Sequence, residues 1–509
     1  MNTIRLFLAM ASLTVLSACG GGSTGSNGNT NPAQPPPTDT VSGTVLYKGA
    51  PLAGATVTEL LANTSTVIAT VATNASGNYS FSGLTTSGDA ISTYQFWVTK
   101  TGYGFYPSVG SGAKVTRADE NSQFLNNANG IGISYTVIQF DSLANESLSG
   151  ADFNAFDGSN PLVSLPATGQ NASYANGDDG AKKLGVAWPA TRFTDNLNGT
   201  VTDHLTGLIW LRKADCFTPT IFETALTDAN QLASGSCGLT DGSKAGDWRM
   251  PNLNELESLV DVSQSNPALT AGNPFTGVSM SIYWTSTSYY GGNGPAGSPY
   301  AWTIRLSDGR YINDTVNNVK TTSTNEVWAV KGTGGGSVNL QSTGFYVVYS
   351  SGDDGSVQAG VPPTFPRWLD NGNGTIIDTV TGLYWLKMAD CINDTWSNAV
   401  AKVNLLASGQ CGLTDGSVAG SWRMPNRNEM QSLSDRMQAN HADFFNNTFT
   451  SLNGTIFQAP IFTDFVVGQY YWTSTTDAAD TTEAWTVFSC DYGVYDTPKS
   501  ATGYTLAVR

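Results

Sequence analysis

The sequence contains few charged residues and almost no histidine. Asp, Glu, Lys and Arg make up 13% of the 509 residues, about half of the ~25% that is typical of globular proteins. His204 and His441 are the two histidines, which removes most zinc sites and most histidine general bases from consideration. Surface polarity must therefore come from Ser, Thr, Asn and the 55 glycines, a composition typical of a turn-rich β protein.

Basic residues are especially scarce. The chain has 24 Lys and Arg against 40 Asp and Glu, a net charge of −16. It has no run of Lys or Arg, so the basic stripe that nucleic-acid binding requires is missing. It also lacks an H-E-x-x-H motif, a phosphate loop and a dinucleotide fingerprint in a strand–helix context. We therefore expect no nucleic-acid partner, no cofactor and no metal.

The first residues form a targeting segment. The apolar run Leu6–Leu16 follows Arg5 and is shorter than the ~20 residues of a membrane-spanning helix, so residues 1–18 are predicted to be a signal peptide. The sequence Leu16-Ser-Ala-Cys19-Gly20 resembles the bacterial lipobox. The resemblance implies cleavage before Cys19 and lipidation of its thiol, and Gly20 implies sorting to the outer membrane. The alternative is an ordinary cleavage site in which Cys19 is incidental.

Residues 19–40 consist mainly of Gly, Ser, Asn, Thr and Pro and include Pro35-Pro-Pro37. Such a segment cannot bury enough apolar surface to fold, and it becomes stiffer near the prolines. It is predicted to be a linker that tethers the folded part of the chain to a membrane lipid.

Residues 41–160 are predicted to form a β-sandwich. Val41, Gly43, Val45 and Tyr47 alternate with polar residues, as on one face of a strand. The segments Val41-Ser-Gly-Thr-Val, Pro51-Leu-Ala-Gly-Ala-Thr-Val and Gly77-Asn-Tyr-Ser-Phe resemble the carboxypeptidase regulatory-like, transthyretin-like sandwich family. The resemblance extends to about residue 106 and implies a spacer or adhesion module.

Two similar segments, 166–331 and 341–509, make up the rest of the chain; we call them copy 1 and copy 2. Gly177-Asp-Asp-Gly180 recurs as Gly352-Asp-Asp-Gly355 at an offset of 175 residues, and Trp248-Arg-Met-Pro-Asn252 recurs at an offset of 174. Tyr283-Trp-Thr-Ser-Thr287 recurs at an offset of 188, so copy 2 carries an insertion. A period this long indicates tandem domains rather than a solenoid, whose units are ~20–50 residues.

Local patterns predict the same elements in both copies. Asn-x-Asn-Gly segments at 196–199 and 371–374 are typical of hairpin turns. Asn252 with Glu255, and Asn426 with Glu429, form capping-box patterns that open helices. A further helix is predicted over 396–407, and Tyr-Trp-Thr-Ser-Thr has the composition of a strand.

Three motifs together, Thr-Gly-Leu-x-Trp-Leu, Trp-Arg-Met-Pro-Asn-x-x-Glu and Tyr-Trp-Thr-Ser-Thr, resemble the C-terminal domain of Lcl-type collagen-like adhesins. The family is also distantly similar to C-type-lectin and formylglycine-generating-enzyme folds. The resemblance implies a multidomain chain in which an all-β sandwich precedes two α+β, C-type-lectin-like domains. It also implies binding of host or matrix glycans, glycosaminoglycans in particular.

The charge of both copies departs from that role. Copy 1 has 11 basic and 15 acidic residues, and copy 2 has 8 and 16. A sulfated glycan would be repelled by that field unless a local basic patch exists. We therefore expect binding, without a sulfated ligand.

The cysteines are spaced alike in both copies. Cys216 and Cys237 lie 21 residues apart, and Cys391 and Cys411 lie 20 apart, which in an exported protein predicts one disulfide in each copy. Four cysteines around a metal are the alternative, but structural zinc sites usually show close pairs of the C-x-x-C kind, and none exists here. Cys490 is left over.

The acidic loops are predicted to be structural. Asp178-Asp179 and Asp353-Asp354 sit between glycines, so we expect solvated turn residues, with calcium binding as the alternative. The loops that begin at Asp195 and Asp370 place glycine at the fifth position instead of the sixth, so they do not match the calcium loop of an EF-hand.

Among the aromatics, tryptophans within regular elements are expected to lie in the core. These are Trp210, Trp248, Trp284, Trp385, Trp422 and Trp472. Loop aromatics are better candidates for binding, and Tyr289, Tyr290 and Tyr300 are predicted to form a ligand loop. The matching loop of copy 2, residues 477–483, has no aromatic residue.

The sequence thus predicts a non-catalytic adhesin or glycan- or protein-binding lipoprotein, exposed at the cell surface and held to the outer membrane by its N-terminal lipid. A structural component of an envelope or extracellular assembly is the alternative. An enzyme related to formylglycine-generating proteins is a third possibility, and fold analogy supports it only weakly. Two tandem copies raise the effective concentration of weak sites, which favours the binding role.

Overall fold

The fold was analysed in a computed structural model. The structure describes residues 39–61, 67–84, 92–100, 103–107, 136–140, 147–149, 153–156, 162–289, 299–312, 318–345, 347–362, 367–436, 445–446, 449–450, 456–458 and 461–509. Cys19, the linker up to residue 38, Tyr290 and His441 lie outside these ranges. No helix in the described ranges has the length and apolar character needed to cross a bilayer.

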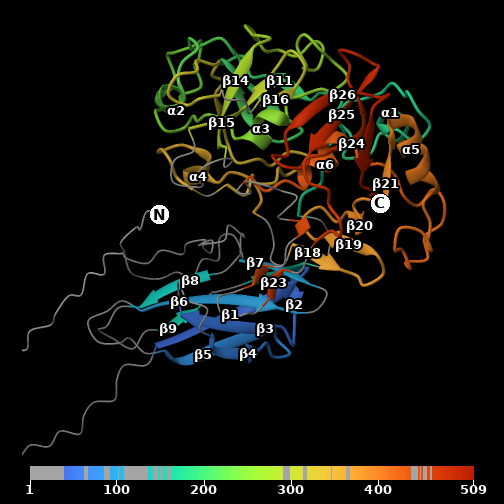
Figure 1. Cartoon of the computed structure of the whole chain (residues 1–509). Helices are drawn as coiled ribbons and strands as arrows, with labels where there is room; N and C mark the ends of the chain where they lie inside the picture. Colours follow the sequence, from blue (N-terminus) through green and yellow to red (C-terminus); the bar gives the residue numbers. More distant parts are fainter. Residues whose placement is uncertain are drawn as a thin grey trace, which may run out of the picture.

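The N-terminal strands form two sheets that share one core (Figure 1). The first sheet has the order β2-β1-β10-β7, and β5 and β9 also pair with β1. The second has the order β4-β3-β6-β8. The strands are β1 (Asp39–Tyr47), β2 (Ala50–Pro51), β3 (Thr56–Leu61), β4 (Val67–Ala72), β5 (Asn78–Leu84), β6 (Ser92–Thr99), β7 (Gly104–Pro107), β8 (Thr136–Phe140), β9 (Ser147–Ser149) and β10 (Phe153–Phe156).

The predicted alternation explains this core. Val41 and Val45 of β1, Phe81 of β5 and Phe96 of β6 point inward and are at most 3% exposed. Strands β8 and β10, in the region where the sequence resemblance has faded, complete the two sheets. The prediction of a β-sandwich is consistent with this arrangement.

The described residues of copy 1 form short sheets and three helices. The sheets are β11-β12-β13-β17 and β14-β15-β16. The elements are α1 (Asp179–Lys182), β11 (Phe193–Asp195), β12 (Thr200–Asp203), β13 (Ile209–Leu211), α2 (Phe222–Gln231), α3 (Leu253–Glu257), β14 (Ile282–Ser288), β15 (Ala301–Arg305), β16 (Arg310–Ile312) and β17 (Val330–Lys331).

Copy 2 repeats this order with additions. Its strands form the sheets β18-β19-β20, β21-β27-β24-β25-β26 and β22-β23. The elements are α4 (Asp354–Val357), β18 (Trp368–Asp370), β19 (Thr375–Asp378), β20 (Tyr384–Leu386), β21 (Ile392–Thr395), α5 (Trp396–Leu405), α6 (Arg427–Ser432), β22 (Phe449–Thr450), β23 (Ile456–Gln458), β24 (Tyr470–Thr476), β25 (Glu483–Phe488), β26 (Val494–Pro498) and β27 (Thr502–Thr505).

The local predictions for the two copies are confirmed. The Asn-x-Asn-Gly turns join β11 to β12 and β18 to β19 as antiparallel hairpins. Both capping boxes are complete, at the starts of α3 and α6. All six tryptophans that were expected in the core are fully buried.

Each hairpin turn lies against the disulfide loop of its own copy. Gly199 and Gly374 both have φ of +85°, and a Cβ atom on either would lie 2.4 Å from the carbonyl oxygen of Gly238 or Gly412, next to the second cysteine. Because a carbonyl of the main chain cannot yield as a side chain can, these two positions require glycine.

We expect Gly199→Ala to destabilise the protein by more than about 1 kcal/mol, since the native backbone is incompatible with the added Cβ. Thermal unfolding followed by tryptophan fluorescence measures this loss. Gly242→Ala is the matched control, because Gly242 has a φ of +75° but nothing within 4 Å of its Cβ position. Equal losses in the two variants would show that the contact with Gly238 contributes nothing.

A segment precedes the first strand of each copy, and much of it packs against the other copy. We call residues 163–187 arm 1 and residues 338–361 arm 2. Each arm also keeps a contact with its own copy, through Val262 N to Thr168 O (3.2 Å) and Arg436 N to Thr343 O (2.9 Å). The outer part lies on the other copy: in Figure 1, α1 of arm 1 lies beside α5 and β24, and α4 of arm 2 lies below α2 and β15.

Candidate functional site

The motifs that define the repeat converge where each arm meets the opposite copy. In the junction on copy 1, the hydroxyl of Thr287 on β14 donates to Asp354 Oδ2 of arm 2 at 2.7 Å. The side-chain amides of Asn252 and Asn254 donate to the carbonyls of Ala359 (3.1 Å) and Gln341 (2.8 Å). A strand motif, a helix motif and the Asp-Asp motif thus meet in one place.

The junction on copy 2 repeats this geometry with the roles exchanged. Thr475 on β24 donates to Asp179 Oδ2 of arm 1 at 2.7 Å. Asn428 donates to the carbonyl of Pro166 at 3.0 Å, and the backbone N–H of Thr476 donates to Gln170 Oε1 at 2.7 Å. The two junctions are therefore related by the same offsets as the sequence repeat.

The paired aspartates are buried, and the expectation that they are solvated turn residues is wrong. All four are at most 3% exposed. Asp178 and Asp353 cap the short helices α1 and α4 by accepting from Ala181 N and Ser356 N. Asp179 and Asp354 instead face the opposite copy. The Gly-flanked aspartates thus begin short helices, and these helices are covered by the opposite copy.

Each junction also contains a partly buried ion pair from the Trp-Arg-Met-Pro-Asn-x-x-Glu motif. The guanidinium of Arg249 binds both carboxylate oxygens of Glu255 at 2.6 Å, and Arg423 binds Glu429 at 2.5 and 2.6 Å. The same glutamates accept from the backbone N–H groups of Asn252 and Asn426. These side chains stabilise the junction, and few of their hydrogen-bonding groups remain for a ligand.

In each junction, a lysine of one copy contacts the arm that belongs to the other copy. Lys320 Nζ donates to Ser288 Oγ at 2.6 Å and lies 3.9 Å from the ring centroid of Tyr349 in arm 2. Lys499 Nζ donates to Thr476 Oγ1 at 2.8 Å and lies 4.6 Å from the ring of Tyr174 in arm 1. Burial lowers the pKa of each lysine to about 8, against the opposing effect of nearby carboxylates.

The two copies also meet directly through β16 and β26. Arg310 on β16 forms an ion pair with Asp496 on β26. Arg427, which is fully buried, pairs with Glu257 at 2.8 Å. A cavity of about 80 Å³ lies between the copies, well below the ~300–1,000 Å³ of a typical ligand pocket. This cavity is therefore too small to hold a glycan.

The predicted tyrosine loop is only partly open. Tyr289 is half-buried, and its ring meets that of Trp302 edge-on with centroids 5.2 Å apart. Burial raises the pKa of Tyr289 to about 12, and Asp491 of copy 2 adds to the shift. Tyr300 pairs with Tyr289 through the backbone at 3.0 Å and is partly exposed. Tyr290 lies outside the described residues, so the structure brings two of the three predicted residues together.

Acidic residues occupy the matching positions of copy 2. Asp477 and Glu483 pair through their backbone at 3.2 Å, as Tyr289 and Tyr300 do. Their carboxylates and that of Asp496 lie within 4.8 Å of one another, the one such group of potential metal ligands within the described ranges. Since Arg310 already neutralises Asp496, an ion is not needed to account for the cluster.

An open hollow beside the first disulfide was not predicted from the sequence. It has a volume of about 730 Å³ and is lined by Asp195, Leu197, Gly199, Arg212, Lys213, Cys237, Gly238 and Thr276. Arg212 pairs with Asp195 at 3.1 Å, whereas Lys213 is exposed and enters no described ion pair. In copy 2 the pair is Lys387 with Asp370, and Met388 stands at the position of Lys213.

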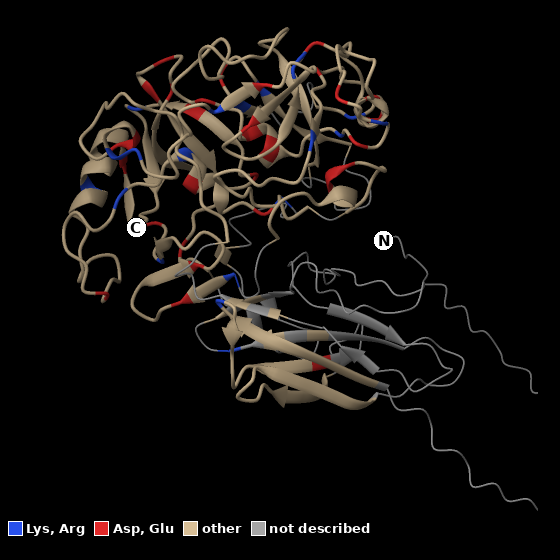
Figure 2. Cartoon of the chain, turned by 180° about the vertical axis from the view of Figure 1, so that it is seen from behind, with Lys and Arg blue, Asp and Glu red and all other residues tan. Residues whose placement is uncertain are grey.

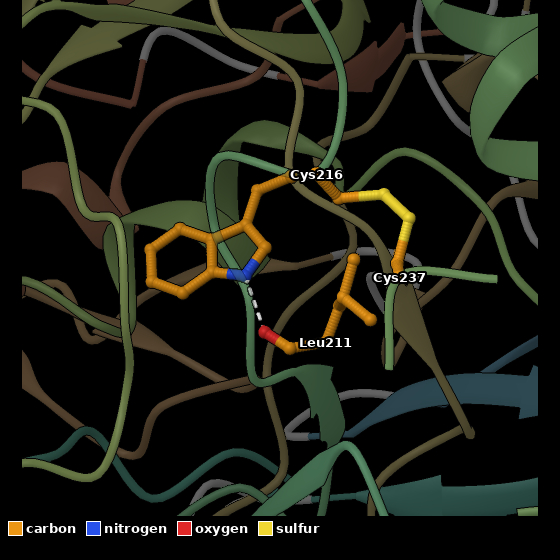
Figure 3. Close-up of a disulfide and its surroundings, with 4 residues drawn as sticks. Leu211, Cys216 and Cys237 are labelled. Carbon is orange, nitrogen blue, oxygen red and sulfur yellow. Dashed lines mark hydrogen bonds between the residues drawn. A yellow bond between two sulfur atoms is a disulfide. The ribbon is translucent and has the colours of Figure 1, made fainter. Parts of the chain in front are cut away.

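Both predicted disulfides are present. Cys216 joins Cys237 and Cys391 joins Cys411, with Cα–Cα distances of 5.5 and 5.7 Å, within the usual range. Figure 3 shows the first bond beside Leu211, whose carbonyl accepts from the indole of Trp328 at 2.7 Å. Cys490 takes part in neither bond.

The family of Lcl C-terminal domains matches residues 199–331 and 374–509. Both matches contain a disulfide, a capping box and a Tyr-Trp-Thr-Ser-Thr strand, and both begin after the arms. No curated protein matches the chain. With two matched segments that together cover more than half of its length, the chain belongs to the Lcl C-terminal domain family.

Proposed function

We propose that the protein is a non-catalytic binding lipoprotein of the cell envelope, an adhesin for glycan or protein ligands, held to the outer membrane through Cys19. Family membership indicates a cell-surface or extracellular protein. The proposal includes a transthyretin-like fold for the sandwich and a C-type-lectin-like fold for each copy.

The observation that carries the proposal is the burial of the motifs shared by the two copies. The Arg, Glu, Asn, Thr and Asp side chains of these motifs are used in the arm junctions. Surfaces available to a ligand are therefore those where the copies differ. A catalytic site common to both copies would need matched residues that are exposed. The described residues of these junctions provide no such set.

Copy 1 offers two such surfaces. The hollow presents Lys213 where copy 2 has methionine, and the loop presents Tyr300 where copy 2 has Glu483. Lys and Arg are scattered among Asp and Glu over both copies (Figure 2), so the hollow is a local basic feature, not part of a basic face. An exposed ammonium beside an open hollow and a tyrosine at a loop suit a polar ligand such as a glycan.

The test is a glycan-array and matrix-protein screen with the lipid-free chain that begins at residue 20. We expect binding that falls about tenfold or more in Lys213→Met or Tyr300→Ala, the effect of losing a contact of more than about 1.4 kcal/mol. Tyr289 is unsuitable for this test because its ring packs on Trp302.

The matched controls come from copy 2. Met388→Lys and Glu483→Tyr place the copy 1 residues at the corresponding positions, and neither is expected to weaken binding. A screen without any ligand for the folded chain would refute the adhesin role. Ligand binding that is unchanged in both copy 1 variants would refute these two surfaces.

A further inference from the structure

Two buried carboxyl groups hold the outer parts of the arms. Asp179 is 3% exposed and Asp354 is 1% exposed. Asp179 Oδ2 accepts from Thr475 of copy 2 and, at 2.6 Å, from Thr168 of its own arm. Asp354 Oδ2 accepts from Thr287 of copy 1 and, at 2.6 Å, from Thr343 of its own arm. Each carboxyl thus receives one hydroxyl from either side of its junction.

No Lys or Arg among the described residues forms an ion pair with these carboxyls, and the buried Oδ1 of Asp354 has no hydrogen-bond partner there. A buried ionised carboxylate needs such partners. The two hydroxyls on one oxygen can serve a carboxyl in either protonation state, so burial without a paired cation is what favours the protonated form.

The charged groups that face Asp354 are unfavourable to an anion. Glu255 of α3 and Asp353 of the arm are both acidic neighbours. The positive charge of Arg249 also attracts Asp354, but Nη1 and Nη2 of its guanidinium are bound by Glu255. Burial, opposed by the hydroxyls of Thr343 and Thr287, raises the pKa of Asp354 to about 7.

Asp179 has equivalent neighbours. Glu429 of α6 and Asp178 of the arm are the acidic groups, and the guanidinium of Arg423 is bound by Glu429. Burial, opposed by the hydroxyls of Thr168 and Thr475, raises the pKa of Asp179 to about 6.

We propose that the two arm junctions form a proton-dependent clasp, in which protonated Asp179 and Asp354 hold each arm on the opposite copy and loss of the protons loosens the arms. The clasp does not depend on which ligand the protein binds. It determines how tightly the two copies are held together.

The sign follows from proton linkage. A carboxyl in a released arm has a pKa of about 4, so the folded junction binds the proton more tightly than the open arm does. The stabilisation is complete below pH ~4 and is lost as the pH rises to the folded pKa. Between these limits the equilibrium constant for release of an arm from the opposite copy, the opening constant, rises about tenfold per pH unit for each carboxyl. From pH 5 to pH 8 we expect a rise of about tenfold for arm 1 and about a hundredfold for arm 2.

Hydrogen exchange of the lipid-free chain from residue 20, measured by peptide mass spectrometry at pH 5, 6, 7 and 8, tests the clasp. After correction for intrinsic exchange, the reporters are arm amides such as those of Lys183 and Gln358, which donate to Asp179 O and Asp354 O. Asp179→Asn and Asp354→Asn keep an oxygen for the two hydroxyls and remove the charge. Each is expected to abolish the pH dependence of its own arm and to protect that arm above pH 7.

Two further variants complete the test. Asp390→Asn removes an exposed carboxylate and should leave both arms unchanged. Thr287→Val removes one hydroxyl donor and should raise the opening of arm 2 at every pH. The proposal is overturned if the wild-type arms open equally at pH 5 and pH 8, or if the asparagine variants retain the wild-type profile. The wild-type profile alone decides the matter should an asparagine variant fail to fold.

Discussion

Replacement of Glu257 by glutamine is expected to remove about 2.5 kcal/mol from the decrease in the free energy of unfolding between pH 5 and pH 8. Glu257 pairs with Arg427, which is fully buried and has two guanidinium nitrogens without a hydrogen-bond partner within the described residues. Arginine does not lose its proton in a protein. Glu257 is therefore the partner in this pair that changes its charge in this pH range.

The glutamine variant should compare better with the wild type at pH 8 than at pH 5. Burial, against the opposing effects of Arg427 and Arg436, raises the pKa of Glu257 to about 7, whereas a glutamate of the unfolded chain has a pKa of about 4.3. The folded wild type therefore binds the proton more tightly, and this stabilisation is lost as the pH rises through 7. Urea unfolding at pH 5 and pH 8, followed by tryptophan fluorescence, measures the difference.

Arg427→Leu is the matched variant, because copy 1 has Leu253 at this position. It should enlarge the loss of stability between pH 5 and pH 8, since the guanidinium opposes the rise in the pKa of Glu257. The double variant Glu257→Leu, Arg427→Leu should lack this contribution to the pH dependence at little cost in stability, because apolar residues often replace a buried pair without cost. A pH dependence of Glu257→Gln equal to that of the wild type would contradict this account.

Local structure could be predicted from the sequence because its causes are local. Asn252 and Glu255 make a capping box whichever domain surrounds them, and the box is present. The cysteine spacing indicated the two disulfides, since both cysteines of a pair lie within about 20 residues. The six tryptophans within predicted regular elements were expected in the core, and the structure confirms them there.

The exchange of arms could not be predicted in this way. An internal repeat has the same offsets whether an arm packs on its own copy or on the other. Thr475 and Asp179 are 296 residues apart, and Thr287 and Asp354 are 67 apart. Nothing in the local pattern of either aspartate identifies that partner, so Gly-flanked acids were expected in solvent.

The exchange begins where arm 1 begins. Val163 N donates to Val380 O of copy 2 at 3.0 Å, so the chain contacts copy 2 before it reaches the first strand of copy 1.

Removal of either disulfide is expected to cost about 3 kcal/mol, the chain-entropy estimate for a loop of about 20 residues. Because the stabilisation comes largely from restricting the unfolded chain, Cys216→Ala with Cys237→Ala and Cys391→Ala with Cys411→Ala should have similar effects. Guanidinium unfolding of each double variant measures the cost, and the unreduced wild type provides the reference.

The backbone conformation of the second cysteine in each pair adds to the cost of an alanine substitution. Cys237 and Cys411 have φ of 52° and 48°, a conformation that disfavours alanine. Cys237→Gly, combined with Cys216→Ala, removes this backbone cost and should be less damaging than the double alanine variant. Thiol counting of the denatured, unreduced chain from residue 20 should yield one thiol, that of Cys490, whereas a count of five would disprove both bonds.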